Sequence, residues 1–96
     1  MADFYLTSRA ASDLAEIADY TIETFGIEQA RRYRDALEIC FQAIADNPSL
    51  GREADKLAPK LRRHQHKSHV VFYLPETKGV LIVRVLHENR DFEQHF

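Results

Sequence analysis

Val-Leu-Ile-Val-Arg-Val-Leu-His, residues 80–87, is the stretch of sequence that decides the fold. It is rich in β-branched residues and almost continuously apolar, which is typical of a buried β-strand. Alternate side chains of a strand point to opposite faces. One face ends at His87 and carries the aliphatic residues Leu81, Val83 and Val85. The other is interrupted by Arg84 alone and carries the aliphatic residues Val80, Ile82 and Leu86. Because a sheet with one bare side shows polar residues there, we expect the C-terminal tail or a partner to cover this second apolar face.

Two more strands precede this stretch and form an antiparallel meander with it. Residues 68–74, Ser-His-Val-Val-Phe-Tyr-Leu, are the second strand, and a short turn joins it to the last one. Residues 60–66 form the first strand, which is the least apolar of the three. In the tail that follows the meander, Phe92 and Phe96 have a spacing that favours one or two helical turns.

The N-terminal part of the chain predicts a short strand and a first helix. Residues 4–7 alternate like a strand, and Thr7 is a suitable N-cap for the helix that follows. The apolar stripe of this helix recurs at three- and four-residue steps and consists of Leu14, Ile17, Ala18, Thr21 and Phe25. Its remaining face is acidic and consists of Asp13, Glu16, Asp19 and Glu23. Gly26 is a suitable residue to end the helix.

A second helix is predicted from Ile27 to Asn47, because Pro48 forces the residue before it out of the helical region. Its stripe consists of Ala30, Tyr33, Leu37, Phe41 and Ile44, with Cys40 beside it. The connection at Gly26 is so short that the two helices should form an antiparallel hairpin. Residues 48–59 are a loop. The order βααβββ predicts an α+β fold: a single domain over residues 1–96, with the hairpin on a small, mainly antiparallel four-stranded sheet.

Composition and charge exclude several classes of protein. The chain has 96 residues, a net charge of −2 and one cysteine, so it has no internal disulfide and no cysteine zinc cluster. It has no apolar run of the roughly 18 residues that a membrane span needs, and its N-terminus is unlike a signal peptide, so we expect a cytoplasmic protein. Residues 1–56 carry eleven acidic and six basic residues, whereas residues 57–84 carry six basic residues and one acidic. This basic segment permits an acidic partner without requiring nucleic acid.

Patterns for metal binding and covalent catalysis are weak. His64 and His66 share one face of a predicted strand, and a zinc site would need a third ligand from His69, His87 or His95. A solvated histidine face is the favoured interpretation. Ser68, His69 and Asp91 are the residue types of a hydrolase triad, but adjacent strand residues point in opposite directions.

RNA cleavage without a metal needs a base, cations for the phosphorane and an acid. Base and cations could come from Arg62, Arg63, Lys67, Arg84, His87 and Arg90. The acid is harder to find: His95 could serve, whereas Phe92 carries no ionisable group. The pattern favours an anionic partner more than catalysis.

Several segments in the right order resemble the ParE branch of the RelE/ParE superfamily, the toxins of type II toxin–antitoxin modules. They are Leu-Thr-Ser-Arg-Ala at residues 6–10, Ile-Ala-Asp-Tyr at 17–20, Phe-Gly at 25–26, Asn-Pro-Ser-Leu-Gly-Arg at 47–52, Ser-His-Val-Val-Phe-Tyr at 68–73 and Ile-Val-Arg-Val-Leu-His at 82–87. The resemblance implies the same βααβββ fold. It also implies a toxin that needs no cofactor, makes and breaks no bond, and acts by trapping DNA gyrase on cleaved DNA.

The resemblance further implies a ParD-type antitoxin that forms a hetero-oligomer with the toxin and lays a helix against its apolar surface. Candidate residues for the toxin's target are Arg62, Arg63, Arg84, His87, Arg90 and Asp91. Candidate residues for the antitoxin are Leu14, Ile17, Tyr20, Tyr73 and Ile82. Arg84 could instead form a structural ion pair with Asp91 or Glu93.

Two alternatives to a gyrase inhibitor stay open. The first is a RelE-like endonuclease that cleaves mRNA on the ribosome, because Arg84 lies on the strand where such toxins place cations. The second is a non-toxic binding module. It is kept because Glu88-Asn89-Arg90-Asp91-Phe92 departs from the family's usual Gly, Arg, apolar residue and Asp-Tyr at this place.

Overall fold

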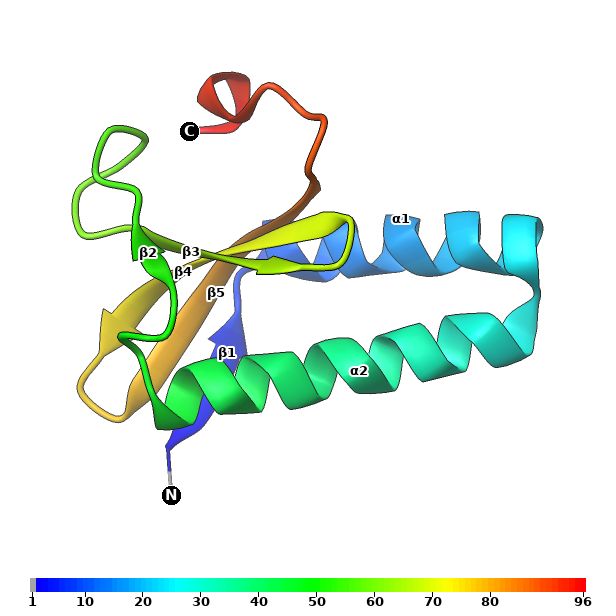
Figure 1. The fold of residues 1–96 in the computed structure, drawn as a ribbon, viewed down its shortest axis with the longest axis horizontal. Helices are drawn as coiled ribbons and strands as arrows, with labels where there is room; N and C mark the ends of the chain where they lie inside the picture. Colours follow the sequence, from blue (N-terminus) through cyan, green and yellow to red (C-terminus); the bar gives the residue numbers. More distant parts are fainter. Residues whose placement is uncertain (1) are drawn as a thin grey trace.

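The computed structural model describes residues 2–96. Its two helices are α1 (Ser8–Phe25) and α2 (Ile27–Asp46), and a short 3₁₀ helix, η1 (Phe92–His95), closes the chain (Figure 1). The strands are β1 (Asp3–Leu6), β2 (Arg52–Glu53), β3 (Arg62–His66), β4 (His69–Glu76) and β5 (Gly79–His87). No helix among residues 2–96 is long and apolar enough to cross a membrane.

The strands form one mixed sheet in the order β1-β5-β4-β3-β2. The three long strands make the predicted antiparallel meander, and β1 joins β5 in parallel. The α+β class and the mainly antiparallel sheet are therefore confirmed, but the sheet has five strands rather than four. The additional strand is β2, which pairs with β3 inside the segment predicted to be a loop. Two residues are too few for a periodic pattern, so the sequence does not reveal this strand.

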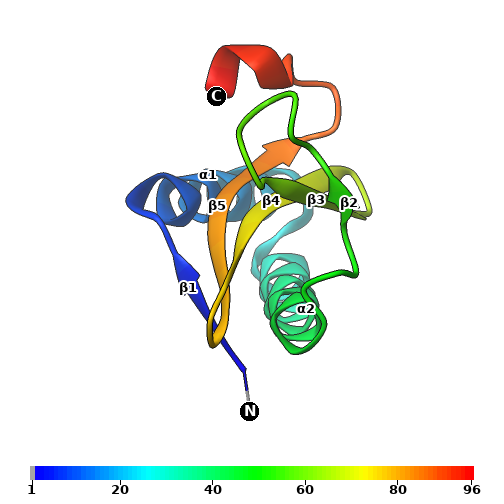
Figure 2. The ribbon, with the colours of Figure 1, turned by 90° about the vertical axis from the view of Figure 1, so that its left-hand side faces the viewer.

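The helical hairpin covers one face of the sheet and extends beyond its end (Figures 1 and 2). The Thr7 hydroxyl accepts from the N–H of Ala10, as an N-cap does, and Gly26 ends α1 with φ of 91°. The residues of the hairpin that lie over the sheet are buried with it in one core, which includes Leu37, Phe41, Ile44, Val71, Tyr73 and Ile82. The end of the hairpin has no sheet beneath it, so its apolar residues remain at the surface.

The second face of the sheet has its own small core around Phe72. The loop between β2 and β3 contributes Ala54 and Leu61 to this core, and the tail contributes Phe92. The Phe72 ring centroid lies 5.0 Å from that of Phe92 and 4.8 Å from that of Phe96. Of the two covers expected for this face, the C-terminal tail is therefore the one present, together with the loop.

A bulge in β5 changes which residues share a face. Phe72 pairs with Arg84 and Tyr73 with Ile82, so Val83 is an extra residue with no partner in β4. The residues after Val83 therefore change sides: Val85 lies in the core under the helices, whereas Val83 and Leu86 lie with Phe72 on the other face. The simple alternation predicted for residues 80–87 holds as far as Val83 and is wrong beyond it.

Candidate functional site

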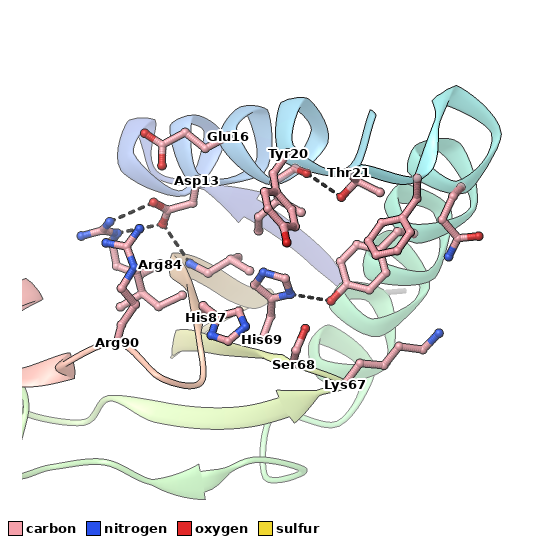
Figure 3. Close-up of a pocket in the computed structure, with 16 residues that line it drawn as sticks. Asp13, Glu16, Tyr20, Thr21, Lys67, Ser68, His69, Arg84, His87 and Arg90 are labelled. Carbon is pink, nitrogen blue, oxygen red and sulfur yellow. Dashed lines mark hydrogen bonds and ion pairs between the residues drawn. The ribbon is translucent and has the colours of Figure 1, made fainter. Parts of the chain in front are cut away.

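A cleft of about 740 Å³ lies between α1 and the adjoining ends of β4 and β5. Its α1 wall includes the apolar side chains of Ile17, Tyr20 and Phe25. Its sheet wall is polar and includes Ser68, His69 and His87 (Figure 3). The cleft therefore has apolar side chains on α1 opposite a polar sheet wall, an arrangement that an amphipathic segment of another polypeptide fits.

Arg84 and Asp13 form a buried ion pair at the floor of this cleft. Arg84 donates from Nε and Nη2 to the two carboxylate oxygens of Asp13, each over 2.8 Å (Figure 3). Asp13 also accepts the N–H of Val85 over 3.0 Å. The hydrogen bonds and charge of Asp13 raise the pKa of Arg84 above its usual value. Because β1 ends opposite Ile82, this part of β5 is a sheet edge, and Asp13 satisfies one of its backbone donors.

The prediction that Arg84 forms a structural ion pair was therefore correct, but the predicted partner was wrong. The expected partners were Asp91 and Glu93, yet the guanidinium binds Asp13 and only approaches the ring of His95, at 3.4 Å. Asp13 had been placed on the exposed acidic face of the first helix, but only 7% of it is exposed. Its burial follows from the tertiary packing of α1 beside the edge of β5, which helical periodicity does not encode.

Three histidines lie next to one another on the neighbouring strands β3, β4 and β5. In the register, His66 is opposite His69, and His69 is opposite His87. The Tyr33 hydroxyl of α2 lies 2.6 Å from Nδ1 of His69, and the rings of His69 and His87 lie 5.6 Å apart. Burial, helped by the neighbouring imidazoles, lowers the pKa of His69, and burial beside Lys67 lowers that of His66. Burial also raises the pKa of Tyr33, so the phenol stays protonated and can donate to a neutral imidazole.

The apolar end of the cleft is formed by the exposed end of the hairpin. Tyr20 is 65% exposed and Phe25 is 66% exposed, and the neighbouring Ile22 and Ile27 are exposed as well. Phe25 had been predicted in the buried stripe of the first helix. It is a surface residue because the hairpin extends past the sheet (Figure 1). Exposed aromatic residues that adjoin a cleft are typical of a protein interaction site.

The residues predicted to contact an antitoxin are divided by their burial. Ile17 and Tyr20 line the cleft, whereas Leu14 lies in a second groove between the two helices. Tyr73 and Ile82 are fully buried in the core under the helices and are not available to a partner. Tyr73 instead holds the loop after α2, because its hydroxyl donates to the carbonyl of Pro48 and accepts the N–H of Gly51.

The residues predicted to contact the target do not form one cluster. Arg62 is held by the carbonyl of Gly51, and the guanidinium of Arg63 lies 5.2 Å from the Phe92 ring centroid. Arg84 is buried with Asp13. His87, the last residue of β5, and Arg90 and Asp91 after it are exposed, and of these three His87 and Arg90 line the cleft. Asp91 caps η1 by accepting the N–H of Glu93.

The residues considered for metal binding and covalent catalysis are not arranged for either chemistry. Among residues 2–96, no three His, Cys, Asp or Glu side chains are grouped so that they could hold a metal ion. His69 is next to Ser68 in the sequence, and its Nδ1 faces the hydroxyl of Tyr33 rather than a carboxylate. Cys40 is buried, and burial raises the pKa of its thiol, which disfavours the nucleophilic thiolate.

A hairpin of two helices on a mixed sheet, with an open and partly apolar cleft, defines a class of small α+β domains. Within this class, the family profile "ParE toxin of type II toxin-antitoxin system, parDE" matches residues 4–92. The chain belongs to this ParE toxin family.

Curated relatives match over nearly their whole length. The toxin ParE1 of Mycobacterium tuberculosis is 36% identical over 97 aligned positions, which cover 99% of both chains. The toxin ParE1 of Caulobacter vibrioides is 36% identical over 95 positions, covering 99% of this chain and 98% of the relative. The toxin ParE of Escherichia coli is 35% identical over 92 positions, covering 95% and 89% of the two chains. The chain is thus a ParE toxin of a type II toxin–antitoxin system.

A solved structure supports the same fold. A chain of the chromosomal ParDE toxin–antitoxin system from P. aeruginosa superposes with a TM-score of 0.76. The match covers 91% of this chain and 96% of that one, at 21% identity. At this identity the likeness supports the fold alone.

Proposed function

We propose that this toxin stops replication by binding DNA gyrase and trapping it on cleaved DNA, and that a ParD-type antitoxin neutralises it by occupying the cleft. Family membership supports the first part. The second part depends on one observation: the cleft adjoins aromatic residues, Tyr20 and Phe25, that the toxin leaves exposed. Action on gyrase would place the toxin in the cytoplasm.

The antitoxin segment that fits this cleft is an amphipathic helix. Its apolar side would pack against Ile17, Tyr20 and Phe25, and its polar side would face the histidines of β4 and β5. Burial of the exposed aromatic residues favours a tight and lasting complex. We expect a hetero-oligomer in which each toxin binds one antitoxin segment.

The target contact is proposed at three exposed residues at and after the end of β5, namely His87, Arg90 and Asp91. This assignment omits the other three predicted cations, because each is engaged within the toxin: Arg62 by Gly51, Arg63 by Phe92 and Arg84 by Asp13. His87 and Arg90 also line the cleft, so an antitoxin seated there would cover part of the target contact. Inhibition by binding alone is preferred to mRNA cleavage, because the strand cation expected in a nuclease is already paired.

Gyrase inhibition is tested with purified components. Toxin added to gyrase, ATP and relaxed plasmid should block supercoiling and leave linear DNA after denaturation and proteolysis, and prior addition of antitoxin should prevent both effects. Arg90→Glu should weaken inhibition at least about tenfold if it loses a charge contact at the target. The matched control is Arg34→Glu, because Arg34 is an exposed arginine of α2 that does not line the cleft. Unchanged supercoiling at a large molar excess of toxin would remove gyrase as the target, and cut mRNA on translating ribosomes would instead support the endonuclease.

The exposed aromatic residues should dominate the affinity for the antitoxin. Tyr20→Ala and Phe25→Ala should each weaken the complex by about 30-fold, the effect of losing an aromatic anchor worth about 2 kcal/mol. Isothermal titration calorimetry with the full-length antitoxin measures this effect. Ile39→Ala is the matched control, because Ile39 is just as exposed but lies outside the cleft. Equal losses in all three variants would contradict docking in the cleft.

A further inference from the structure

We propose that the sheet wall of the cleft is a receptor for one carboxylate side chain of the antitoxin. This inference depends on the proposed docking of the antitoxin in the cleft, and it adds a chemical requirement that docking alone does not impose. The receptor consists of Tyr33, Ser68, His69 and His87, with Lys67 and Arg90 on its two sides. Figure 3 shows Ser68, His69 and His87 close together along this wall.

Hydrogen-bond donors converge on this wall from three elements. The Tyr33 hydroxyl of α2 is paired with Nδ1 of His69 at 2.6 Å, so a neutral His69 carries its proton on Nε2. That Nε2–H has no hydrogen-bond partner among residues 2–96. Ser68 contributes a hydroxyl beside it, which interacts with Tyr33. A donor without an acceptor in a half-buried wall favours an incoming acceptor.

The charges around His69 also favour an anion. Lys67 and Arg90 line the cleft and make no ion pair with another residue of the described chain. The acidic groups that face the cleft are Asp13 and Glu16 on α1, and Arg84 already neutralises Asp13. Glu88 is the one carboxylate that acts on the His69 ring from the sheet side, where it opposes the stronger effects of burial, His87 and His66. The sheet wall is therefore deficient in negative charge.

The backbone at Lys67 supports a function for its charge. Lys67 is in the turn between β3 and β4 and has φ of 51°, a left-handed conformation that glycine or asparagine adopts more easily. The ammonium lies 6.0 Å from the centroid of the Tyr33 ring, at the border of the donor cluster. The strained residue thus places a cation beside the proposed receptor.

A carboxylate fits this wall better than a neutral or cationic group. The opposite wall contains the apolar side chains of Ile17, Tyr20 and Phe25, so a helix seated in the cleft would present aliphatic residues to them and an Asp or Glu to His69. The donors are neutral groups bordered by two cations, the combination that binds a single partly buried anion. A cation at this position would face Lys67 and Arg90 without compensation.

A carboxylate bound beside His69 determines whether the affinity for the antitoxin rises or falls with pH. In the free toxin burial lowers the pKa of His69, so its ring is neutral near pH 7. A carboxylate beside His69 favours the imidazolium and raises that pKa, so the complex binds more protons than its separated components. The affinity should therefore increase as the pH falls. An apolar or cationic group at the same place would lower the pKa of His69 further and reverse the sign.

The test is the affinity of the full-length toxin for its full-length antitoxin between pH 8 and pH 6 at constant ionic strength. We expect the complex to be about three- to tenfold tighter at pH 6. His69→Gln should weaken this dependence, because glutamine keeps a donor but takes up no proton between pH 8 and pH 6. His64→Gln is the matched control, because His64 is on β3 but does not line the cleft.

A second measurement identifies the carboxylate itself. Each Asp and Glu of the antitoxin's C-terminal segment is changed to Asn or Gln and tested against wild-type toxin and against Lys67→Gln. At one position, the effects of the antitoxin substitution and of Lys67→Gln on the affinity should depart from additivity by a factor of at least about five. Affinity that is constant or falls toward pH 6, or the absence of any coupled position, overturns the carboxylate receptor and leaves antitoxin docking intact. Failure to form a complex at every pH overturns both proposals.

Discussion

Replacing Arg84 by alanine is expected to lower the free energy of unfolding by about 3–5 kcal/mol. The loss exceeds that of a surface ion pair, because the partner left behind is a buried carboxylate. Asp13 would keep one backbone donor, the N–H of Val85, and lose both guanidinium hydrogen bonds. An unpaired charge with little access to water destabilises the folded state more than the missing contact itself would.

Urea denaturation followed by far-UV circular dichroism measures this effect. Arg34→Ala is the matched control: Arg34 pairs with Glu38 over 3.6 Å on the exposed side of α2, and its loss should change stability by less than about 0.5 kcal/mol. Removing both partners, with Asp13→Leu and Arg84→Met, should recover most of the loss. Equal effects of Arg84→Ala and Arg34→Ala would mean that the Asp13 pair is solvated.

Phe72→Ala should lower the free energy of unfolding by about 3–5 kcal/mol as well, for a different reason. Phe72 is fully buried, and its ring is the central contact between the sheet and the tail. Truncation leaves a cavity and removes the stacking partner of Phe92 and Phe96. The tail should then detach, so the variant should bind a hydrophobic dye such as ANS while its helices stay intact.

Phe25→Ala provides the control for Phe72, because it removes the same side chain from an exposed position. It should change stability by less than about 0.5 kcal/mol while weakening the antitoxin complex. The loss of stability caused by Phe92→Ala should lie between those of Phe72→Ala and Phe25→Ala, because Phe92 is half-buried. A Phe72→Ala protein with unchanged stability and no dye binding would show that the tail does not hold the second face of the sheet.

Local features of the fold could be predicted from the sequence because their causes are local. The strand at residues 80–87, the two helices and the Thr7 cap each depend on neighbouring residues, and each was placed correctly. β2 and the bulge at Val83 depend on pairing between strands, which no pattern within one strand reveals.

The site was harder to predict because its residues meet only in three dimensions. Asp13 and Arg84 are 71 positions apart, and α1 and β5 bring them together. The succession of His66, His69 and His87 requires the register of two strand pairs. The signal for the first pair was present: Lys67-Ser68 is a two-residue turn, which places His66 opposite His69. Phe25 lies beyond the sheet because the hairpin extends past it. Its place in the helical period indicated burial, because periodicity carries no information about the relative lengths of hairpin and sheet.

The tail that lies on Phe72 has a consequence for how this toxin folds during synthesis. Phe92 and Phe96 follow every strand of the sheet in the sequence, and their rings cover the core around Phe72. That core therefore cannot close until the residues after β5 have left the ribosome. A nascent chain that stalls at the end of β5 should expose Phe72 and become a substrate for chaperones or proteases.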